Sequence, residues 1–164
     1  MAHAIVAEKP EHAAGVERAL DRAFGPGRFA KTSERVRERG AQAEPELSRV
    51  ALDDAGEVIG VCRIWRVKAG EEVFFLGPLA VDPNVQAAGL GLTLTRAAVA
   101  ACRASGGAGI LVVGGERFFR PLGFTQAPKD RVILPGPVDP ARLLWLELRP
   151  GGFDRVRGAV TAPD

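Results

Sequence analysis

The stretch between residues 73 and 93 constrains this chain most, because an apolar run there leads directly into a glycine-rich turn and a helical pattern. The apolar run extends to Val81, and residues 82–84, Asp-Pro-Asn, end it with turn-forming side chains. Three residues follow with the spacing Q-x-x-G-x-G: Gln86, Gly89 and Gly91. Apolar residues then recur at helical spacing as far as Ala101. The stretch therefore predicts a strand, a glycine-rich turn and the beginning of a helix.

A turn of this kind is suited to an anionic ligand. The first N–H groups of a helix have no partner within the helix, and the helix dipole adds about half a positive charge at that end. Gly89 and Gly91 have no Cβ, so a ligand can approach the backbone closely. The ligand class predicted from these properties is a phosphate or a pyrophosphate.

Two common phosphate-binding designs do not fit the residues. A P-loop requires Lys and then Ser or Thr after its last glycine, whereas Leu92 and Thr93 follow Gly91. A dinucleotide-binding turn requires a third glycine, whose place is held by Leu94, and an acidic residue about 20 positions further on, which is missing as well. A third design must therefore account for the turn.

The pattern Leu79-Ala80-Val81-Asp82-Pro83, followed by Q-x-x-G-x-G, resembles the acetyl-CoA-binding motif of the GNAT N-acetyltransferases. The resemblance continues through 110–114 to the Phe-Phe-Arg-Pro-Leu-Gly-Phe of 118–124. In detail the chain resembles the YhbS-like bacterial branch, with 76–81 and 146–151 as further marks. A single G-x-G would be weak evidence, but here two separated motifs agree in order and spacing. The alternative is an ordinary strand, turn and helix.

The resemblance covers nearly the whole chain and implies one N-acetyltransferase domain over residues 1–164. The implied fold is α/β (α+β), with a mixed, mostly antiparallel sheet flanked by helices and with central strands that splay apart. Hydrophobic periodicity predicts elements in a matching order. The expected strands are 3–7, 47–52, 57–67, 73–81, 109–113, 143–148 and 156–160, and the expected helices are 10–24, 32–39, 90–101 and 116–122.

The resemblance also implies a site for acetyl-CoA or CoA as co-substrate. Backbone groups of Leu79, Ala80 and Val81 would hold pantetheine as an added strand. The Leu79 N–H would polarise the thioester carbonyl, and Phe119 would line the site. The pyrophosphate would bind the loop formed by Gln86, Ala87, Ala88, Gly89, Leu90, Gly91, Leu92 and Thr93.

Two departures from the family pattern matter. Ala87 and Ala88 stand where the family often has a glycine and a basic residue, which removes a charged contact but leaves the backbone N–H groups. Phe119 stands where a tyrosine commonly protonates the departing thiolate, and the chain contains no tyrosine. A non-catalytic acyl-CoA-binding sensor or partner module is therefore an alternative to the enzyme.

The general base has two candidates at the start of the central strand, Glu71 and Glu72. Since adjacent strand residues face opposite ways, at most one of them can point into the slot. They can equally be solvated acids of a turn. The charges of 28–39, near the expected acceptor pocket, are interpreted as a solvated helix face.

Composition limits the partners. The chain has 164 residues and a net charge of +2, too small to indicate nucleic acid or membrane binding. No signal peptide and no run of about 18 apolar residues is found, so a cytoplasmic protein is expected. Cys62 and Cys102 are expected to be free thiols, and no metal site is predicted. The expected partner is a small-molecule or peptide amine, bound by a monomer or homodimer.

Overall fold

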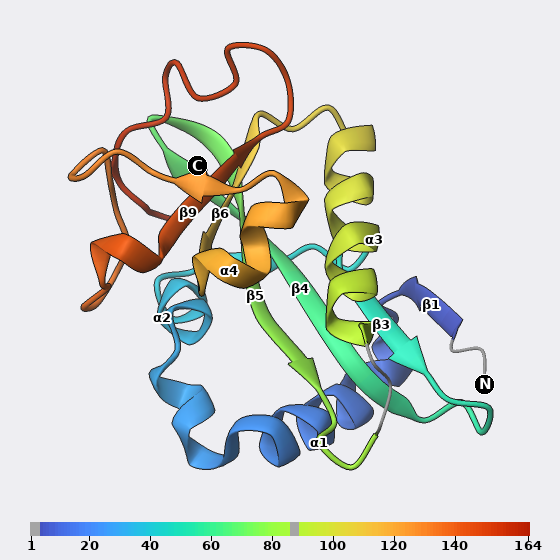
Figure 1. The fold of residues 1–164 in the computed structure, drawn as a ribbon. Coiled ribbons are helices and arrows are strands. Elements are labelled where there is room, and N and C mark those ends of the chain that lie inside the picture. The colour runs from blue at the N-terminus through green and yellow to red at the C-terminus, as the bar shows by residue number, and fades with distance from the viewer. Residues whose placement is uncertain (1–3, 86–88) are drawn as a thin grey trace.

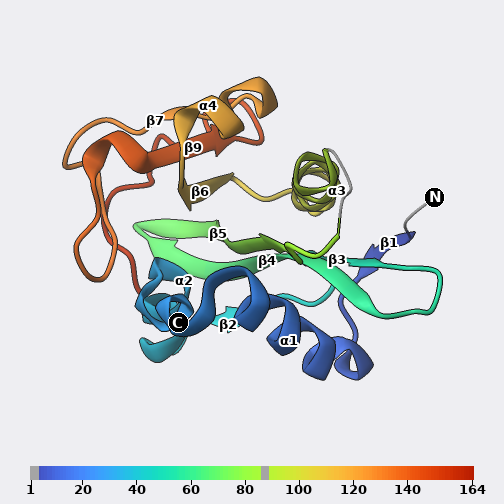
Figure 2. The ribbon, with the colours of Figure 1, turned by 60° about the horizontal axis from the view of Figure 1, so that its bottom comes forward.

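The computed structural model describes residues 4–85 and 89–164, in which a long sheet lies between two layers of helices (Figures 1 and 2). Along the sheet the strands follow the order β1-β3-β4-β5-β6-β9-β7, and β2 pairs with β4. All neighbours are antiparallel except β5 and β6, which are parallel. This confirms the predicted fold class. The strands are β1 Ala4–Ala7, β2 Gln42–Ala43, β3 Arg49–Leu52, β4 Val58–Ala69, β5 Glu71–Val81, β6 Gly109–Val113, β7 Thr125–Gln126 and β9 Leu143–Glu147.

The helices are divided between the two faces of the sheet. Figure 2 shows α1 and α2 on one face, and α3 and α4 on the other. The α-helices are α1 Ala13–Phe24, α2 Thr32–Glu38, α3 Leu90–Ala104 and α4 Glu116–Phe119. Short 3₁₀ turns are η1 Pro10–His12, η2 Gly25–Ala30, η3 Arg120–Leu122 and η4 Pro140–Arg142. No helix in the described ranges is long and apolar enough to cross a membrane.

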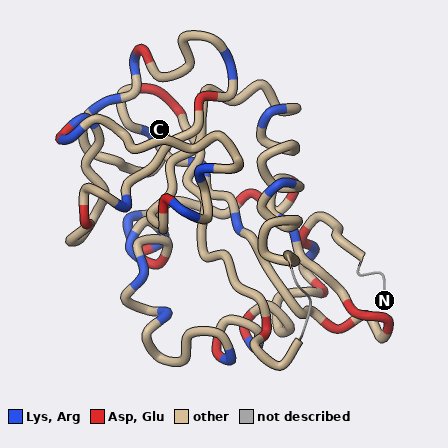
Figure 3. The backbone as a smooth tube through the Cα atoms, in the orientation of Figure 1, with Lys and Arg blue, Asp and Glu red and all other residues tan. Residues whose placement is uncertain are grey.

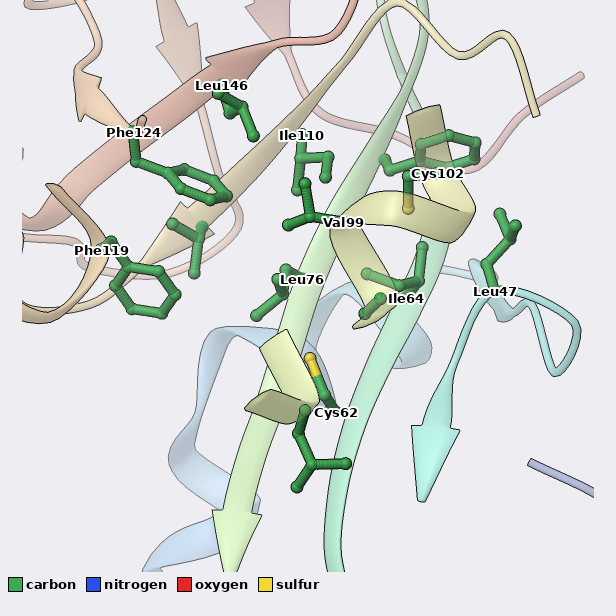
Figure 4. Packing of buried hydrophobic residues seen from close by; sticks show 14 of the residues in the cluster. Leu47, Cys62, Ile64, Leu76, Val99, Cys102, Ile110, Phe119, Phe124 and Leu146 are labelled. Atoms are coloured by element: carbon green, nitrogen blue, oxygen red, sulfur yellow. The ribbon is translucent and has the colours of Figure 1, made fainter. Parts of the chain in front are cut away.

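Helix α3 is held by one apolar stripe. Leu94, Ala98 and Cys102 recur every four residues and are fully buried, as the helical period requires. They pack on the face of the sheet that carries Cys62 and Ile110, in the cluster drawn in Figure 4. A separate cluster holds α1 on the opposite face of β3, β4 and β5. The central strands are therefore covered on both sides.

Several strand predictions are wrong at their ends by one or two residues, and contacts explain the errors at 47–48 and over 156–160. The strand expected from residue 47 begins at Arg49, because Ser48 closes a turn, with its N–H and its hydroxyl both donating to the Glu44 carbonyl at 2.9 Å. The edge strand expected over 156–160 is only β10, Gly158–Ala159, which pairs with β8, Val132–Ile133, in a separate small sheet. Arg131 holds the preceding segment in a loop by donating to the carbonyls of Phe153 and Val156.

A bulge interrupts the pairing of β4 with β5. Leu76 pairs with Ile64 and Leu79 with Cys62, so Gly77 and Pro78 together oppose the single residue Arg63. The Gly77–Pro78 peptide bond is cis, and Gly77 has a φ of 146°, a conformation that favours glycine. The indole Nε1 of Trp65 donates to the Gly77 carbonyl and holds the bulge from the neighbouring strand. A bulge bends its strand at this point.

Strands β5 and β6 separate at the bend. They pair only at residues 74–76 of β5 with 110–112 of β6, and β5 then continues to Val81 without β6. Figure 1 shows this end of β5 running on past β6 and α4. One edge of the last β5 residues is thus left without a strand partner, as expected for splayed central strands.

Asp82 anchors the turn after β5. Its carboxylate accepts the Asn84 N–H at 2.9 Å and the Arg22 guanidinium at 2.8 Å, and its own N–H donates to the Ile59 carbonyl. The side chain is almost fully buried. The Asn84 N–H first, and the Arg22 side chain after it, lower the pKa of Asp82. The turn is therefore tied to both β4 and α1.

We predict that Asp82→Asn destabilises the fold by about 2 kcal/mol near neutral pH, because a buried charge-assisted pair is lost. A carboxylate with a lowered pKa stabilises the fold above its unfolded pKa, and this contribution is lost as the pH falls through the folded pKa. The difference from wild type, measured by urea unfolding, should therefore shrink below about pH 4. Asp54→Asn, at an exposed position of the β3–β4 turn, is the matched control and should change little. Equal stability of Asp82→Asn and wild type at pH 7 would contradict the anchor.

Candidate active site

The separation of β5 and β6 opens a slot of about 380 Å³. Residues 75–79 of β5 form one wall, and residues 112–115 at the end of β6 form the other. Helix α4 and the segment from α1 to α2 close its two sides. The bulge thus lies inside the slot wall, and what the slot can bind depends on which backbone and side-chain groups face it.

Leu79 and Val81 present backbone groups to the open edge. The Asp82 N–H donates to Ile59 on β4, and backbone groups alternate in direction along a strand. The N–H and C=O of Ala80 therefore face β4, and those of Leu79 and Val81 face the side that β6 has left. Ala80 also turns its side chain into the core beneath α1. The expectation that all three residues offer backbone groups to a ligand is thus corrected for Ala80.

The N-terminus of α3 provides a second set of N–H groups. Among the described residues, the Thr93 N–H makes the first helical bond, to Gly89 at 3.0 Å, and the N–H groups of Leu90, Gly91 and Leu92 have no helical acceptor there. Gly89 has a φ of 77°, which favours glycine. The predicted loop residues Gln86, Ala87 and Ala88 lie outside the described residues.

Gly91 faces the end of the slot. A Cβ at this position would lie 3.8 Å from Val81 Cγ2 and 3.9 Å from Phe118 Cζ, which is ordinary van der Waals contact. Gly91 therefore lies between Val81 of β5 and Phe118 of α4, where the N-terminus of α3 approaches the slot. The predicted turn and the predicted strand edge thus lie side by side.

Phe119 forms the apolar floor of the slot. Its ring packs edge-on against Phe118 and Phe124, with centroids 4.8 Å and 5.3 Å away, and lies directly over Gly114, where a Cβ would clash with it. Figure 4 shows the ring of Phe119 beside that of Phe124 at the margin of the core. Phe119 lines the slot, and its side chain offers no proton.

Two cations line the slot that no sequence motif indicates, Lys31 and Arg142. Lys31 precedes α2, and Arg142 ends η4. Lys31 belongs to the charged segment interpreted as a solvated helix face, so that interpretation is wrong for this residue. No local pattern separates Lys31 from its charged neighbours, because only the packing of α2 against the bulge brings it to the slot.

Glu71 and Glu72 lie at the opposite end of β5 from the slot. They are eight and seven positions before Leu79, which in an extended strand is about 20 Å or more. Glu71 accepts from Arg149 at 3.0 Å, and Glu72 pairs with Arg66 at 3.4 Å. The expectation that one of them reaches the slot as a base is therefore corrected. Strand β5 extends over Glu71–Val81, and its bend, at Gly77 and Pro78, lies nearer to the Val81 end than to Glu71 and Glu72.

A second cavity of about 300 Å³ adjoins the slot on the α1 side of the sheet. The two cavities share Ser33 and Pro78. Unlike the slot, this cavity has carboxylates in its lining, Glu17 and Glu34. Its three arginines pair with acids: Arg28 with Glu17, Arg37 with Glu34, and Arg63 with Glu8.

Cys62 pairs directly with Leu79, but its thiol cannot act as a nucleophile towards the slot. Both Cys62 and Cys102 are fully buried in the core beneath α3 (Figure 4). Burial raises the pKa of both thiols, that of Cys102 to about 12, and proximity to Cys102 raises that of Cys62 further. In the part of the chain that the structure describes, no three His, Cys, Asp or Glu side chains converge as a metal site.

Comparison with known proteins agrees with the fold and the site geometry. Residues 14–124 match the model of the acetyltransferase (GNAT) family, and the chain belongs to this family. It is 26% identical to the GNAT family N-acetyltransferase YhbS from Escherichia coli, crystallised in complex with CoA, with a TM-score of 0.81 over 98% of this chain and 89% of that one. A GNAT family acetyltransferase from Brucella melitensis, crystallised with acetyl-CoA, is also 26% identical, with a TM-score of 0.71 over 99% and 96% of the two chains. No curated protein matches the chain significantly.

The buried thiols give a prediction that does not depend on activity. Because the thiolate is the reactive form, Cys62 and Cys102 should stay unmodified by a disulfide reagent at pH 8 in the folded protein, and both should react in denaturant. Quantifying released chromophore with and without guanidinium measures this. Ala97→Cys, on the half-buried side of α3, serves as the reactive control. Rapid modification of either native cysteine would contradict the burial.

Proposed function

We propose that this chain is a single acetyltransferase domain that transfers acetyl from acetyl-CoA to a primary amine of a small molecule or peptide. The observation that carries the proposal is the unpaired edge of β5 at Leu79 and Val81, which leads to the N-terminus of α3 past Gly91. Membership of the GNAT family and the CoA and acetyl-CoA complexes of similar structures support it.

The described residues fit acetyl-CoA along this path. Backbone groups of Leu79 and Val81 would pair with pantetheine as a strand would. The N–H groups of Leu90, Gly91 and Leu92 would bind the pyrophosphate, favoured by the helix dipole. The loop 86–88 is proposed to complete that site. Phe119 would pack on the apolar end of the cofactor. Acetyl-CoA supplies the activated acyl group.

The Leu79 N–H is proposed to polarise the thioester carbonyl. A preorganised donor of this type can contribute about 3 kcal/mol where negative charge develops on the oxygen. The strand geometry fixes the direction of this N–H before any ligand arrives, because Trp65 holds Gly77 on one side and the pairing of Ala80 with Val61 holds the other. The amine would attack the thioester directly, since the two thiols are buried and protonated.

The proton of the incoming ammonium needs an acceptor other than Glu71 or Glu72. We propose that it leaves directly, or through water, towards the adjoining cavity, where Glu17 and Glu34 offer carboxylates. On the leaving-group side Phe119 supplies no acid. The absence of a tyrosine acid favours a second candidate function, a non-catalytic acyl-CoA-binding module. Release of CoA thiol from acetyl-CoA in the presence of amines would exclude this second candidate.

We predict that Gly91→Ala keeps the fold and impairs CoA binding. The new Cβ meets only ordinary contacts, and alanine suits a helix better than glycine, so stability should be unchanged or raised by up to about 1 kcal/mol. The same Cβ takes up space between Val81 and Phe118, so CoA affinity should fall about tenfold or more. Thermal unfolding and calorimetric titration of CoA measure the two effects.

Gly27→Ala is the matched control for this prediction. A Cβ at Gly27 would have open space around it, and this glycine lies in η2, away from α3. Its CoA affinity should equal that of wild type. Equal affinities of Gly91→Ala and wild type would place the pyrophosphate elsewhere.

We predict that Phe119→Tyr holds or raises the turnover of acetyl-CoA with an amine, because it adds a phenol O–H in a slot that has no tyrosine. Phe119→Leu, which removes the ring that packs on Phe118 and Phe124, should lose turnover and stability. Steady-state release of CoA thiol and calorimetric CoA titration separate rate from binding. A large fall in the rate of Phe119→Tyr with unchanged CoA affinity would show that the bare ring has another role.

A further inference from the structure

Lys31 and Arg142 are the only charged side chains among the described residues that line the slot, and both are cations. Their backbones are held in place: the N–H groups of Glu34 and Arg35 donate to the Lys31 carbonyl, and the Gly114 N–H donates to the Arg142 carbonyl at 2.9 Å. The half-buried Lys31 and the exposed Arg142 thus line one space, which is walled by Phe24, Phe118 and Phe119.

Neither cation has an acidic partner in the part of the chain that the structure describes. This distinguishes them from the adjoining cavity, where each arginine is paired with a carboxylate. Lys31 is half-buried and places its Nζ 3.9 Å from the centroid of the Phe24 ring, a cation–π contact that offsets part of its desolvation. The slot thus holds like charges that no described acid neutralises.

The surroundings of Lys31 also favour a bound anion. Burial lowers the pKa of Lys31, and the neighbouring Arg142 lowers it further. Both effects disfavour the ammonium in the free protein, and a bound anion would counter both. Arg142 adds a planar fork of donors that matches a carboxylate.

We propose that Lys31 and Arg142 bind a carboxylate of the substrate beside the reacting thioester carbonyl. The inference rests on the proposed function, because it takes the slot as the place of acyl transfer. The phosphates of CoA are not the anion in question, since their proposed site is the N-terminus of α3, and Gly89 to Leu92 do not line the slot. An amine without an anionic group would bring no negative charge to Lys31 and Arg142, so it should bind less favourably than an amine that carries a carboxylate.

The carboxylate can belong to either substrate. It can be the terminal carboxylate of a dicarboxylic acyl group on CoA, or the carboxylate of an amino acid acceptor. The recognition chemistry is the same in both cases, a planar anion between an ammonium and a guanidinium. The two sources are separated by titrating each as a charged and neutral pair.

The donor arm compares succinyl-CoA with butyryl-CoA by calorimetric titration of the full chain. The two acyl groups have the same number of carbons, and only the first carries a carboxylate. If the donor is the source, succinyl-CoA should bind about tenfold or more tightly than butyryl-CoA to the wild type. The variant Lys31→Met/Arg142→Gln should lose this preference, and Lys31→Arg should keep it.

The acceptor arm uses the protein saturated with CoA, titrated with an N-acetylated amino acid and with its amide. These are the product of the proposed reaction and its neutral analogue, so the readout does not require turnover. If the acceptor is the source, the acid should bind about tenfold or more tightly than the amide, and again the double variant should lose the difference. Lys129→Met/Arg117→Gln removes the same charges from exposed positions outside the slot and should keep every preference.

A carboxylate preference in either arm, lost only in the Lys31→Met/Arg142→Gln variant, supports the inference and identifies the source. Equal affinities within both pairs for the wild type, with CoA itself bound, overturn the inference and leave the proposed function standing. A preference that survives the double variant also overturns it. Failure of CoA to bind at all overturns the proposed function and this inference with it.

Discussion

The bulge at Gly77 and Pro78 is the constraint on which the site depends. Two residues of β5 occupy the space opposite Arg63 alone, so the strand bends and its last residues cannot stay beside β6. Trp65 holds this geometry from β4 through its bond to the Gly77 carbonyl. Without the bend, the chain at the end of β6 could pair further along β5. The backbone groups of Leu79 would then be hydrogen-bonded within the sheet and could not bind a ligand. The slot is therefore an interruption of sheet pairing that the core on both faces tolerates.

The slot and the neighbouring N-terminus of α3 differ in the way they favour anions. At the N-terminus of α3, backbone N–H groups and the helix dipole favour an anion, and Asp82 ties the turn after β5 to β4 and α1. In the slot, the side chains of Lys31 and Arg142 favour an anion. Acidic and basic residues are otherwise interspersed along the chain (Figure 3), so these are local fields and not a surface of one sign.

Phe119, at the position where the family resemblance leads us to expect a tyrosine, is consistent with this electrostatic arrangement. Phe119 belongs to an aromatic cluster with Phe118 and Phe124, which keeps one side of the slot apolar. In such surroundings a nearby positive charge acts more strongly than it does in water. Lys31, half-buried beside that apolar wall, therefore favours an anion more strongly than a solvated lysine would, and only the packing of the segment before α2 brings it there.

Local patterns predicted the elements well where they depend on neighbouring residues. The turn at Asp82, the helix after Gly89 and the buried strand over 109–113 all follow from turn chemistry and hydrophobic period, and the structure has each of them. The predicted strand over 156–160 is wrong because Arg131, 25 residues before Val156, captures that segment with side-chain bonds. A contact of that range leaves no local signal.

The features of the site also divide into those set by local sequence and those set by long-range contacts. The sequence by itself determined the strand, the glycine-rich turn, the helix N-terminus and the missing phenol at position 119, because these depend on residue type and close spacing. Only the tertiary structure decided which groups meet. It directed the backbone of Leu79, but not that of Ala80, to the open edge. It placed Glu71 and Glu72 at the end of β5 away from Leu79, and it brought Lys31 and Arg142 to the same slot. Those relations arise from strand pairing and helix packing across more than 100 residues, which spacing along the chain does not encode.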